Sequence, residues 1–171
     1  FDSTAPTLSS VSIDSDNASN SATNEIAKVG DTVTLSFTAD ETIQTPTVAF
    51  TVGGASAGGS ITVTNVSGDD WTTTFVLASG DTDGAVGFTI DFADMSGNAG
   101  TQVTSTTDSS SVTFDKMPAL TSVSIDSDSA TSIGTDETAK AGDTVTLSFT
   151  ADKTIQAPTV AFTVGGTSAG G

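Results

Sequence analysis

Acidic side chains gathered in loops carry the most evident chemistry of this chain. Asp and Glu number 21 against 4 basic residues. Many of the acids lie beside Gly, Ser or Asn, whose oxygens can join carboxylates in the shell of six to eight ligands that calcium takes. A structural calcium ion is therefore the cofactor for which these loops offer ligands. The candidate ligands are Asp2, Asp14, Asp16, Asn17, Asp81, Asp83, Asp94, Asn98 and Asp115.

The same clusters also have a plainer interpretation as turns. The run from Asp14 to Asn17 resembles the start of a calcium loop, but the Gly and the distal Glu of an EF-hand do not follow. The run from Asp94 to Asn98 has the composition of an ordinary turn. Each loop taken alone favours a turn, whereas a cation shared by adjoining modules would relieve the repulsion between their carboxylates.

The remaining composition argues against several classes of function. The chain has no His, Cys, Tyr or Arg, so the usual imidazole base and thiol nucleophile are missing, and we expect no enzyme. A formal charge of −17 disfavours nucleic acid and anionic membrane surfaces as partners. No apolar run approaches the length of a membrane-spanning helix.

The elements that must position these loops are β-strands. Val33, Leu35 and Phe37 alternate with Thr and Ser, a period of two that is typical of a half-buried strand. Seven such strands within about 110 residues predict a seven-stranded antiparallel immunoglobulin-like β-sandwich. Trp71 is then expected in the core. The expected strands are Leu8–Ile13, Asp31–Ala39, Pro46–Val52, Ser60–Val66, Trp71–Leu77, Val86–Phe92 and a broken strand over Gln102–Phe114.

In an up-and-down arrangement of seven strands, successive loops alternate between the two ends of the sandwich. Asp14 to Asn17, the loop Gly53–Gly59 and Asp81 to Asp83 should therefore lie near Asp115, where the chain leaves the module. The other clusters should gather at the opposite end. They are Asp40-Glu41, Asp69-Asp70 and the loop Asp94–Asn98, near Asp2.

A long internal repeat defines the domain organisation. Leu8–Gly59 recurs without a gap as Leu120–Gly171, with 40 of the 52 aligned positions identical. The spacing predicts tandem repeats of about 112 residues, with a complete module at 1–115 and the first half of a second at 116–171. We expect the missing strands to lie beyond this segment rather than in a neighbouring chain.

One difference between the copies bears on the candidate ligands. Glu41 has Lys153 as its counterpart, and a Lys would expel a cation. Glu41 is therefore not expected to be a ligand at every junction, whereas Asp40 and its counterpart Asp152 stay candidates.

The run Gly30–Ala39, the single Trp before a strand, the loop Asp94–Gly100 and the linker from Phe1 to Pro6 resemble bacterial Ig-like repeats. Such repeats form the stalks of large secreted adhesins and biofilm surface proteins, and calcium often stiffens their junctions. The resemblance implies an extracellular structural spacer whose partners are the neighbouring modules. Two alternatives stay open. One is a fibre subunit completed by strands from another copy, and the other is a glycan-binding module, for which Trp71 would have to be exposed.

Overall fold

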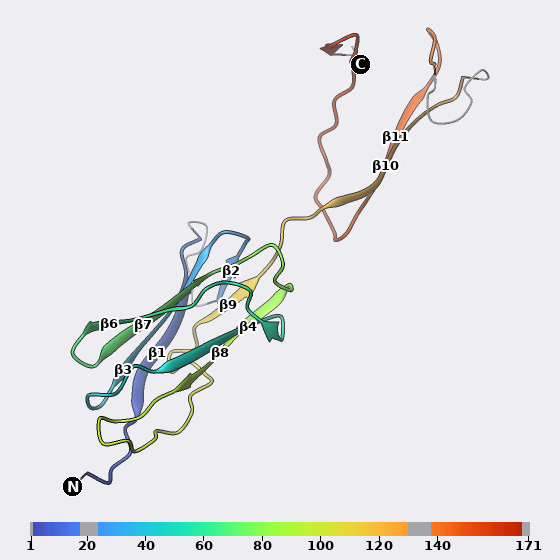
Figure 1. Ribbon diagram of the computed structural model, residues 1–171. Helices are drawn as coiled ribbons and strands as arrows, with labels where there is room; N and C mark the ends of the chain where they lie inside the picture. Colours follow the sequence, from blue (N-terminus) through green and yellow to red (C-terminus); the bar gives the residue numbers. More distant parts are fainter. Residues whose placement is uncertain (1, 18–23, 130–137, 169–171) are drawn as a thin grey trace. The chain divides into compact units, whose positions relative to one another are not determined.

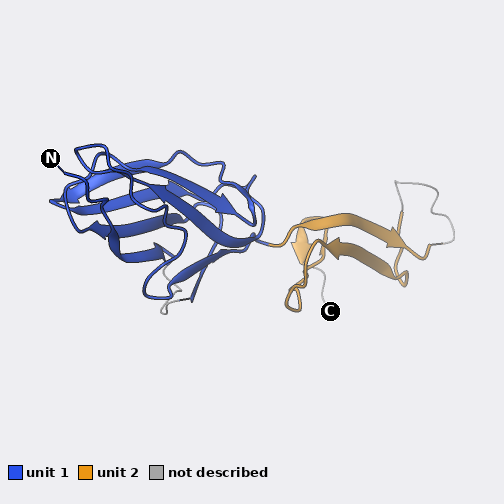
Figure 2. Cartoon of the chain, turned by 90° about the horizontal axis from the view of Figure 1, so that it is seen from below, with its two compact units in different colours: residues 1–117 blue, residues 118–171 orange. Residues whose placement is uncertain are grey.

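The computed structural model describes residues 2–17, 24–129 and 138–168, and every regular element among them is a β-strand. The chain divides into two compact units, unit 1 from Phe1 to Met117 and unit 2 from Pro118 to Gly171 (Figure 2). The all-β character expected from the alternating sequence is confirmed.

The first sheet of unit 1 has four antiparallel strands in the order β1-β3-β7-β6 (Figure 1). Their bounds are Leu8–Ser15 for β1, Thr32–Ala39 for β3, Thr62–Ser67 for β6 and Asp70–Val76 for β7. Strand β3 alternates between buried and half-buried residues along its whole length. Its inner residues are Val33, Leu35 and Phe37, and Thr or Ser occupies the outer positions, as the period of two predicts.

The second sheet of unit 1 has five strands in the order β2-β9-β8-β4-β5. Their bounds are Asn24–Ala27 for β2, Thr47–Val52 for β4, Ala55–Ser56 for β5, Gly84–Asp91 for β8 and Ser111–Phe114 for β9. Strands β2 and β9 run parallel, from Asn24 opposite Ser111 to Ala27 opposite Phe114. The other neighbours in this sheet are antiparallel.

The two sheets pack face to face around one apolar core. The ring of Phe50, from β4, lies 4.4 Å from the ring of Phe75, from β7, so side chains of the two sheets meet directly. Burying side chains of this size contributes about 1.5–3 kcal/mol each. Trp71 is 8 % exposed and belongs to this core. The largest fully buried side chains are Phe37, Phe75, Phe114, Leu35, Leu77 and Ile90.

The segments expected as strands overlap β1, β3, β4, β6, β7, β8 and β9 of unit 1, with shifted ends, and two short strands accompany them. Strand β2 is formed through its parallel partner β9, and β5 pairs with the end of β4. Neither was expected, because neither segment alternates clearly between polar and apolar residues. The broken last strand is reduced to β9, while Val103 makes only an isolated bridge to Ile90.

Unit 2 repeats the first antiparallel strand pair of unit 1, β1 with β3. Strand β10, Leu120–Ser127, pairs with β11, Val145–Ala151, and Leu120 lies opposite Ala151 as Leu8 lies opposite Ala39. Both strand pairs have a bulge in the first strand, where Ser10 and Ser122 have φ of 52° and 50°. Two short strands complete the described part of the unit, β12 at Thr163–Val164 and β13 at Thr167–Ser168.

Candidate functional site

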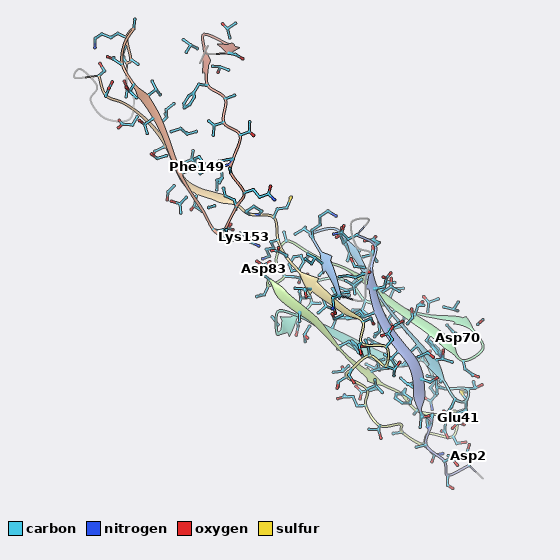
Figure 3. The ribbon with its side chains drawn as sticks, turned by 180° about the vertical axis from the view of Figure 1, so that it is seen from behind. Asp2, Glu41, Asp70, Asp83, Phe149 and Lys153 are labelled. Atoms are coloured by element: carbon cyan, nitrogen blue, oxygen red, sulfur yellow. The ribbon has the colours of Figure 1, made fainter. Side chains whose placement is uncertain are left out.

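The acidic loops of unit 1 gather at the two ends of the sandwich. We call the end that holds Asp2 the N-terminal pole, and the end where β9 leads into the linker the exit pole. Figure 3 shows Asp2, Glu41 and Asp70 at one end of unit 1 and Asp83 at the other. The expected division of the loops agrees with this arrangement, because strand β3 runs from the exit pole to the N-terminal pole and β8 runs the same way.

Three carboxylates meet at the N-terminal pole. Asp2, Glu41 and Asp94 each place one carboxylate oxygen within 4.8 Å of the others, and within the described residues they form the one group of three with this spacing. They come from the entering chain, the loop after β3 and the loop after β8. Oxygens at this separation are able to share one hard cation such as calcium.

Asp94 is fixed in this group by Asn98. Its Oδ1 accepts the backbone N–H of Asn98 at 2.7 Å, and its Oδ2 accepts the Asn98 Nδ2 at 2.7 Å. Burial alone would raise the pKa of Asp94, but the hydrogen bonds from Asn98 and from the turn backbone outweigh it and lower the pKa below 3.8. Asp94 is therefore held as a carboxylate, and Asn98 positions it.

Asn98 also ties the entering chain to this pole. Its Nδ2 donates to the backbone carbonyl of Asp2 at 3.2 Å. Asp2, Asp94 and Asn98, which the sequence analysis placed together as candidate ligands, lie together in the structure.

The surroundings of Glu41 raise the pKa of its carboxyl group. Loss of hydration raises its pKa above the ordinary value of 4.5, and the negative charges of Asp2 and Asp94 raise it further. Asp40 and Asp69 act in the same direction. A cation or a proton at this pole would relieve the repulsion.

Asp40 serves a different purpose from its neighbour. Its two carboxylate oxygens accept the backbone N–H and the Oγ1 of Thr7, each at 2.8 Å, and these bonds lower its pKa. In unit 2, Asp152 accepts the backbone N–H of Ala119 at 2.8 Å. Asp40 in unit 1 and Asp152 in unit 2 therefore bind the backbone directly before the first strand of their unit.

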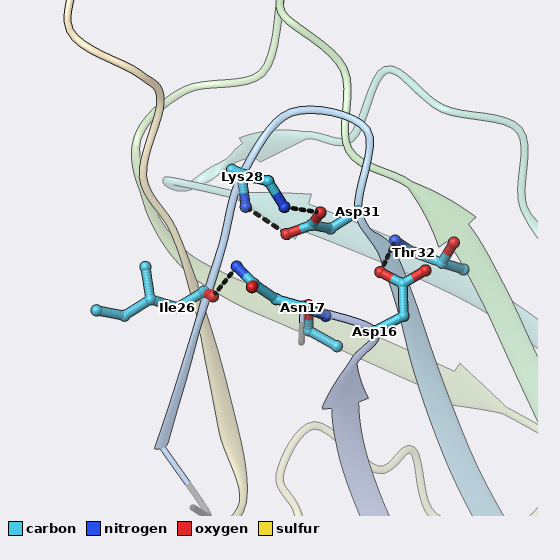
Figure 4. A network of polar contacts seen from close by, with 7 residues as sticks. Asp16, Asn17, Ile26, Lys28, Asp31 and Thr32 are labelled. Atoms are coloured by element: carbon cyan, nitrogen blue, oxygen red, sulfur yellow. Dashed lines mark hydrogen bonds and ion pairs between the residues drawn. The ribbon is translucent and has the colours of Figure 1, made fainter. Parts of the chain in front are cut away.

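At the exit pole, the carboxylates and amides close loops (Figure 4). Asp16 Oδ1 accepts the backbone N–H of Thr32 at 2.7 Å, and Asn17 Nδ2 donates to the carbonyl of Ile26 at 2.9 Å. Buried Asp31 pairs with Lys28, the Nζ to Oδ1 distance being 2.6 Å. Burial opposes the charge on Asp31, yet the hydrogen bonds from Lys28 lower its pKa.

Asp81 and Asp83 close further loops at the exit pole. The buried Asp81 accepts the backbone N–H groups of Gly58 and Ala78, both at 2.8 Å. Asp83 Oδ1 accepts the backbone N–H of Lys116 at 2.8 Å, which fastens the chain as it leaves β9.

Of the last two candidate ligands, Asp14 lies on a strand and Asp115 lies directly after one. Asp14 lies within β1, opposite Thr34, because the strand continues to Ser15 and not only to Ile13. Asp115 follows β9, and its backbone N–H donates to the carbonyl of Ala27 at 2.9 Å.

Glu41 is the member of the N-terminal group that the sequence analysis passed over. Because the second copy has Lys153 at this position, Glu41 was not expected to bind a cation at every junction. That expectation applies to all copies of the repeat together and does not exclude a cation at Glu41 in the first copy. The signal that could have found it is the adjacency of Asp40 and Glu41 directly after a strand that ends at the same pole as Asp94.

No family model matches the sequence, and no curated protein matches it significantly. None of the described residues forms a helix long and apolar enough to cross a membrane.

Proposed function

We propose that this chain is a structural stalk segment of a large extracellular bacterial surface adhesin, in which immunoglobulin-like modules in series project a distal binding domain. The observation that carries the proposal is the placement of the two ends of unit 1. The chain enters beside Asn98 at the N-terminal pole and leaves beside Asp83 at the exit pole. A module that is entered and left at opposite poles adds length each time it is repeated.

The strand order supports an immunoglobulin-like topology for the module. One sheet has the order β1-β3-β7-β6, and the other contains β9, β8 and β4. In chain order these match the A-B-E-D and G-F-C sheets of an immunoglobulin sandwich. Strands β2 and β5 are short additions at the edges of the second sheet.

The parallel pair β2 and β9 supports a load-bearing role. Strand β2 follows the first strand of the module, and β9 is the last, so a pull on the two ends slides these strands along each other. Their four residue pairs and the bond from Asp115 to Ala27 then resist together rather than one after another. This geometry suits a spacer under tension.

The proposal includes a calcium ion at the N-terminal pole, held by Asp2, Glu41 and Asp94. Its support is the 4.8 Å grouping of their oxygens and the raised pKa of Glu41, caused first by loss of hydration and then by the negative charges of Asp2 and Asp94. Because Asp2 belongs to the entering linker, a cation there would stiffen the approach to the module. Lys153 would supply the positive charge at the corresponding position of the next module.

Scattering from arrays of different length tests the stalk proposal. Proteins with two, four and six copies of residues 2–117 should increase their maximum dimension by the same increment for each added module. A compact assembly would instead grow with roughly the 0.38 power of chain length, as globular proteins do. Growth of that second kind would contradict an extender function.

A further inference from the structure

Strand β6 of unit 1 is an edge strand that leaves one row of main-chain groups open. It ends the first sheet and pairs with β7 on one side only (Figure 1). Thr62 to Asn65 pair regularly with β7, and a bulge follows between Asn65 and Ser67. Within the described residues, no hydrogen bond reaches the outer side of β6, and the Asn65 Nδ2 donates to Gly68 in its own turn. A row of free N–H and C=O groups is a template on which another strand pairs.

The other three edges of the two sheets are protected. On β1, the carbonyl of Val11 accepts the backbone N–H of Thr107 at 2.8 Å. On β2, which has only four residues, the carbonyl of Ile26 accepts the Nδ2 of Asn17 at 2.9 Å. Strand β5 has only two residues. Short or covered edges of this kind are how sheets avoid pairing with other chains. Among the described edges of unit 1, β6 is therefore the one that is both long and uncovered.

The edge at β6 is also neutral, in a chain with a formal charge of −17. Residues 42–68, which include β4, β5 and β6, contain no charged side chain, and residues 57–68 contain no proline either. The lysines and prolines that commonly protect an edge strand are thus missing here. Apolar side chains lie exposed along this segment, Ile61 at 38 % and Val66 at 59 %.

We propose that β6 is a self-association site, at which the β6 strands of two copies of this chain pair antiparallel and join their first sheets into one. Charge selects this occupant. Two copies with a charge of −17 repel each other over most of their surfaces, whereas residues 42–68 bring no charge into the contact. A contact about a two-fold axis uses the same strand on both sides, so the open groups of β6 face their own complement.

The acids at one end of β6 determine the direction of pairing. Asp69 lies in the turn after β6, and Asp70 begins β7. Parallel pairing would place these carboxylates of the two copies side by side. Antiparallel pairing separates them by the six-residue strand, about 20 Å. That distance exceeds the screening length of about 8 Å at physiological salt.

The contact is small, so one pair of modules associates weakly. Two six-residue strands bury less than the roughly 1,200 Å² of a stable interface. Several modules in series would add their contacts, because the second contact between two linked arrays forms within one complex. The inference goes beyond the proposed stalk function and does not depend on it. In a stalk, this pairing would join neighbouring stalks side by side.

The test compares the full chain at about 20 μM and at about 2 mM, a range that brackets weak association. Chelator is present throughout, so that a cation at the N-terminal pole plays no part. Sedimentation should show a larger mean mass at the higher concentration. The amides of residues 62–65 that face away from β7 should exchange hydrogen at least about threefold more slowly there, while those of β1 and β2 stay unchanged. A monomer at the higher concentration would overturn the proposal. Association with unchanged exchange in β6 would overturn it as well, since the contact would then lie elsewhere.

Two matched variants separate pairing at β6 from general repulsion. Thr64→Asp and Thr113→Asp each add one negative charge at an exposed threonine, but Thr113 lies on β9, which is paired on both sides. Thr64→Asp should weaken self-association at least about tenfold, because it places like charges in the contact, and Thr113→Asp should change it less than about threefold. Thr62→Asp, on the same strand, replaces Thr64→Asp if the latter lowers the Tm of unit 1. Equal effects at β6 and β9 would refute the proposal.

Discussion

The backbone N–H of Asp115 donates to the carbonyl of Ala27 at 2.9 Å, and this bond continues the parallel ladder of β2 and β9 to the end of the module. It joins the chain just before the linker to a strand near the start of the same module. In the proposed stalk, a load that passes between neighbouring modules would cross this ladder, which connects the fold of unit 1 to its proposed mechanical role.

Calcium should stabilise unit 1, and Glu41→Lys should remove the response. The Lys side chain would place a fixed positive charge beside Asp2 and Asp94, and Lys153 is the residue that stands at the same position of the second copy. We expect the wild-type Tm to rise by several degrees with calcium over chelator, because a ligand that binds only the folded state stabilises it.

The melting temperature of the Glu41→Lys variant can be compared with that of the wild type both in chelator and in calcium. In chelator, Glu41→Lys should melt above the wild type, and calcium should change its Tm little. Asp14→Ala serves as the matched acidic control, because Asp14 lies on the sheet surface away from the three-carboxylate group. A wild-type Tm that is the same in calcium and in chelator would argue against the cation site.

The stability of unit 1 should pass through a maximum at mildly acidic pH. The raised pKa of Glu41 means that the folded state binds its proton more tightly, so stability increases as the pH falls through that pKa, above 4.5. Asp31, Asp40, Asp94 and Asp108 have lowered pKa values, so their contribution is lost as the pH falls below 3.8. Melting curves between pH 7 and 2 would show both limbs. Glu41→Gln should flatten the first limb and keep the second.

A polar atom in the core provides a test of the packing. The hydroxyl of Thr73 is buried without a hydrogen-bond partner in the described structure, between Trp71 and Phe75 on the inner face of β7. Thr73→Val keeps the shape and removes the unsatisfied group, so we expect the free energy of unfolding to rise by about 1 kcal/mol. Thr72→Val, on the outer face, should change it by less than about 0.5 kcal/mol. Urea denaturation of the two variants measures the difference, and a destabilised Thr73→Val would contradict this packing.

The close approach of Gly100 to Phe92 should make this glycine hard to replace. A Cβ at Gly100 would clash with the ring of Phe92, whose side chain is buried. Gly100→Ala should therefore cost about 1–3 kcal/mol through overpacking. Gly80→Ala is the matched control, because a Cβ there meets nothing within 4 Å. Similar urea midpoints for the two variants would show that the Phe92 ring moves aside freely.

The sequence predicted the long strands well because their burial is local in origin. In β3, every second residue is apolar and faces the core, so the sequence itself shows the period of two that is typical of a strand. Strand β2 was not predicted, because its four residues form a strand only by pairing with β9, which is distant in the sequence. The Oγ of Ser111, in β9, donates to the Oδ1 of Asn24, 87 positions earlier in the chain. The sequence Thr-Val-Ala-Phe-Thr-Val also occurs twice: it forms the whole of β4 at 47–52, where β8 pairs along it, but at 159–164 it contributes only Thr163 and Val164 to a strand.

The sequence predicted at which end of the sandwich each acidic loop lies, but it did not predict the hydrogen-bond partners of the individual carboxylates. Alternation of loops placed Asp94 and Asp2 at one end, and the structure agrees. The partners of individual carboxylates depend on turn geometry that composition does not specify. Asp81 therefore binds two backbone N–H groups, whereas Glu41 faces other carboxylates.

The most direct test of the load-bearing account is single-molecule force spectroscopy on unit 1, pulled through residues 2 and 117. Because Asp115 N–H bonds to Ala27 O, alternation along the ladder directs the N–H of Thr113 to β2 as well, and the Thr113 side chain is exposed. Thr113→Pro removes that donor. Val48→Ala, which opens space in the core away from the ladder, provides a comparison of similar or greater thermodynamic cost. The account predicts that Thr113→Pro lowers the unfolding force clearly more than Val48→Ala does. Equal forces, or a larger loss from Val48→Ala, would contradict a parallel β2–β9 clamp.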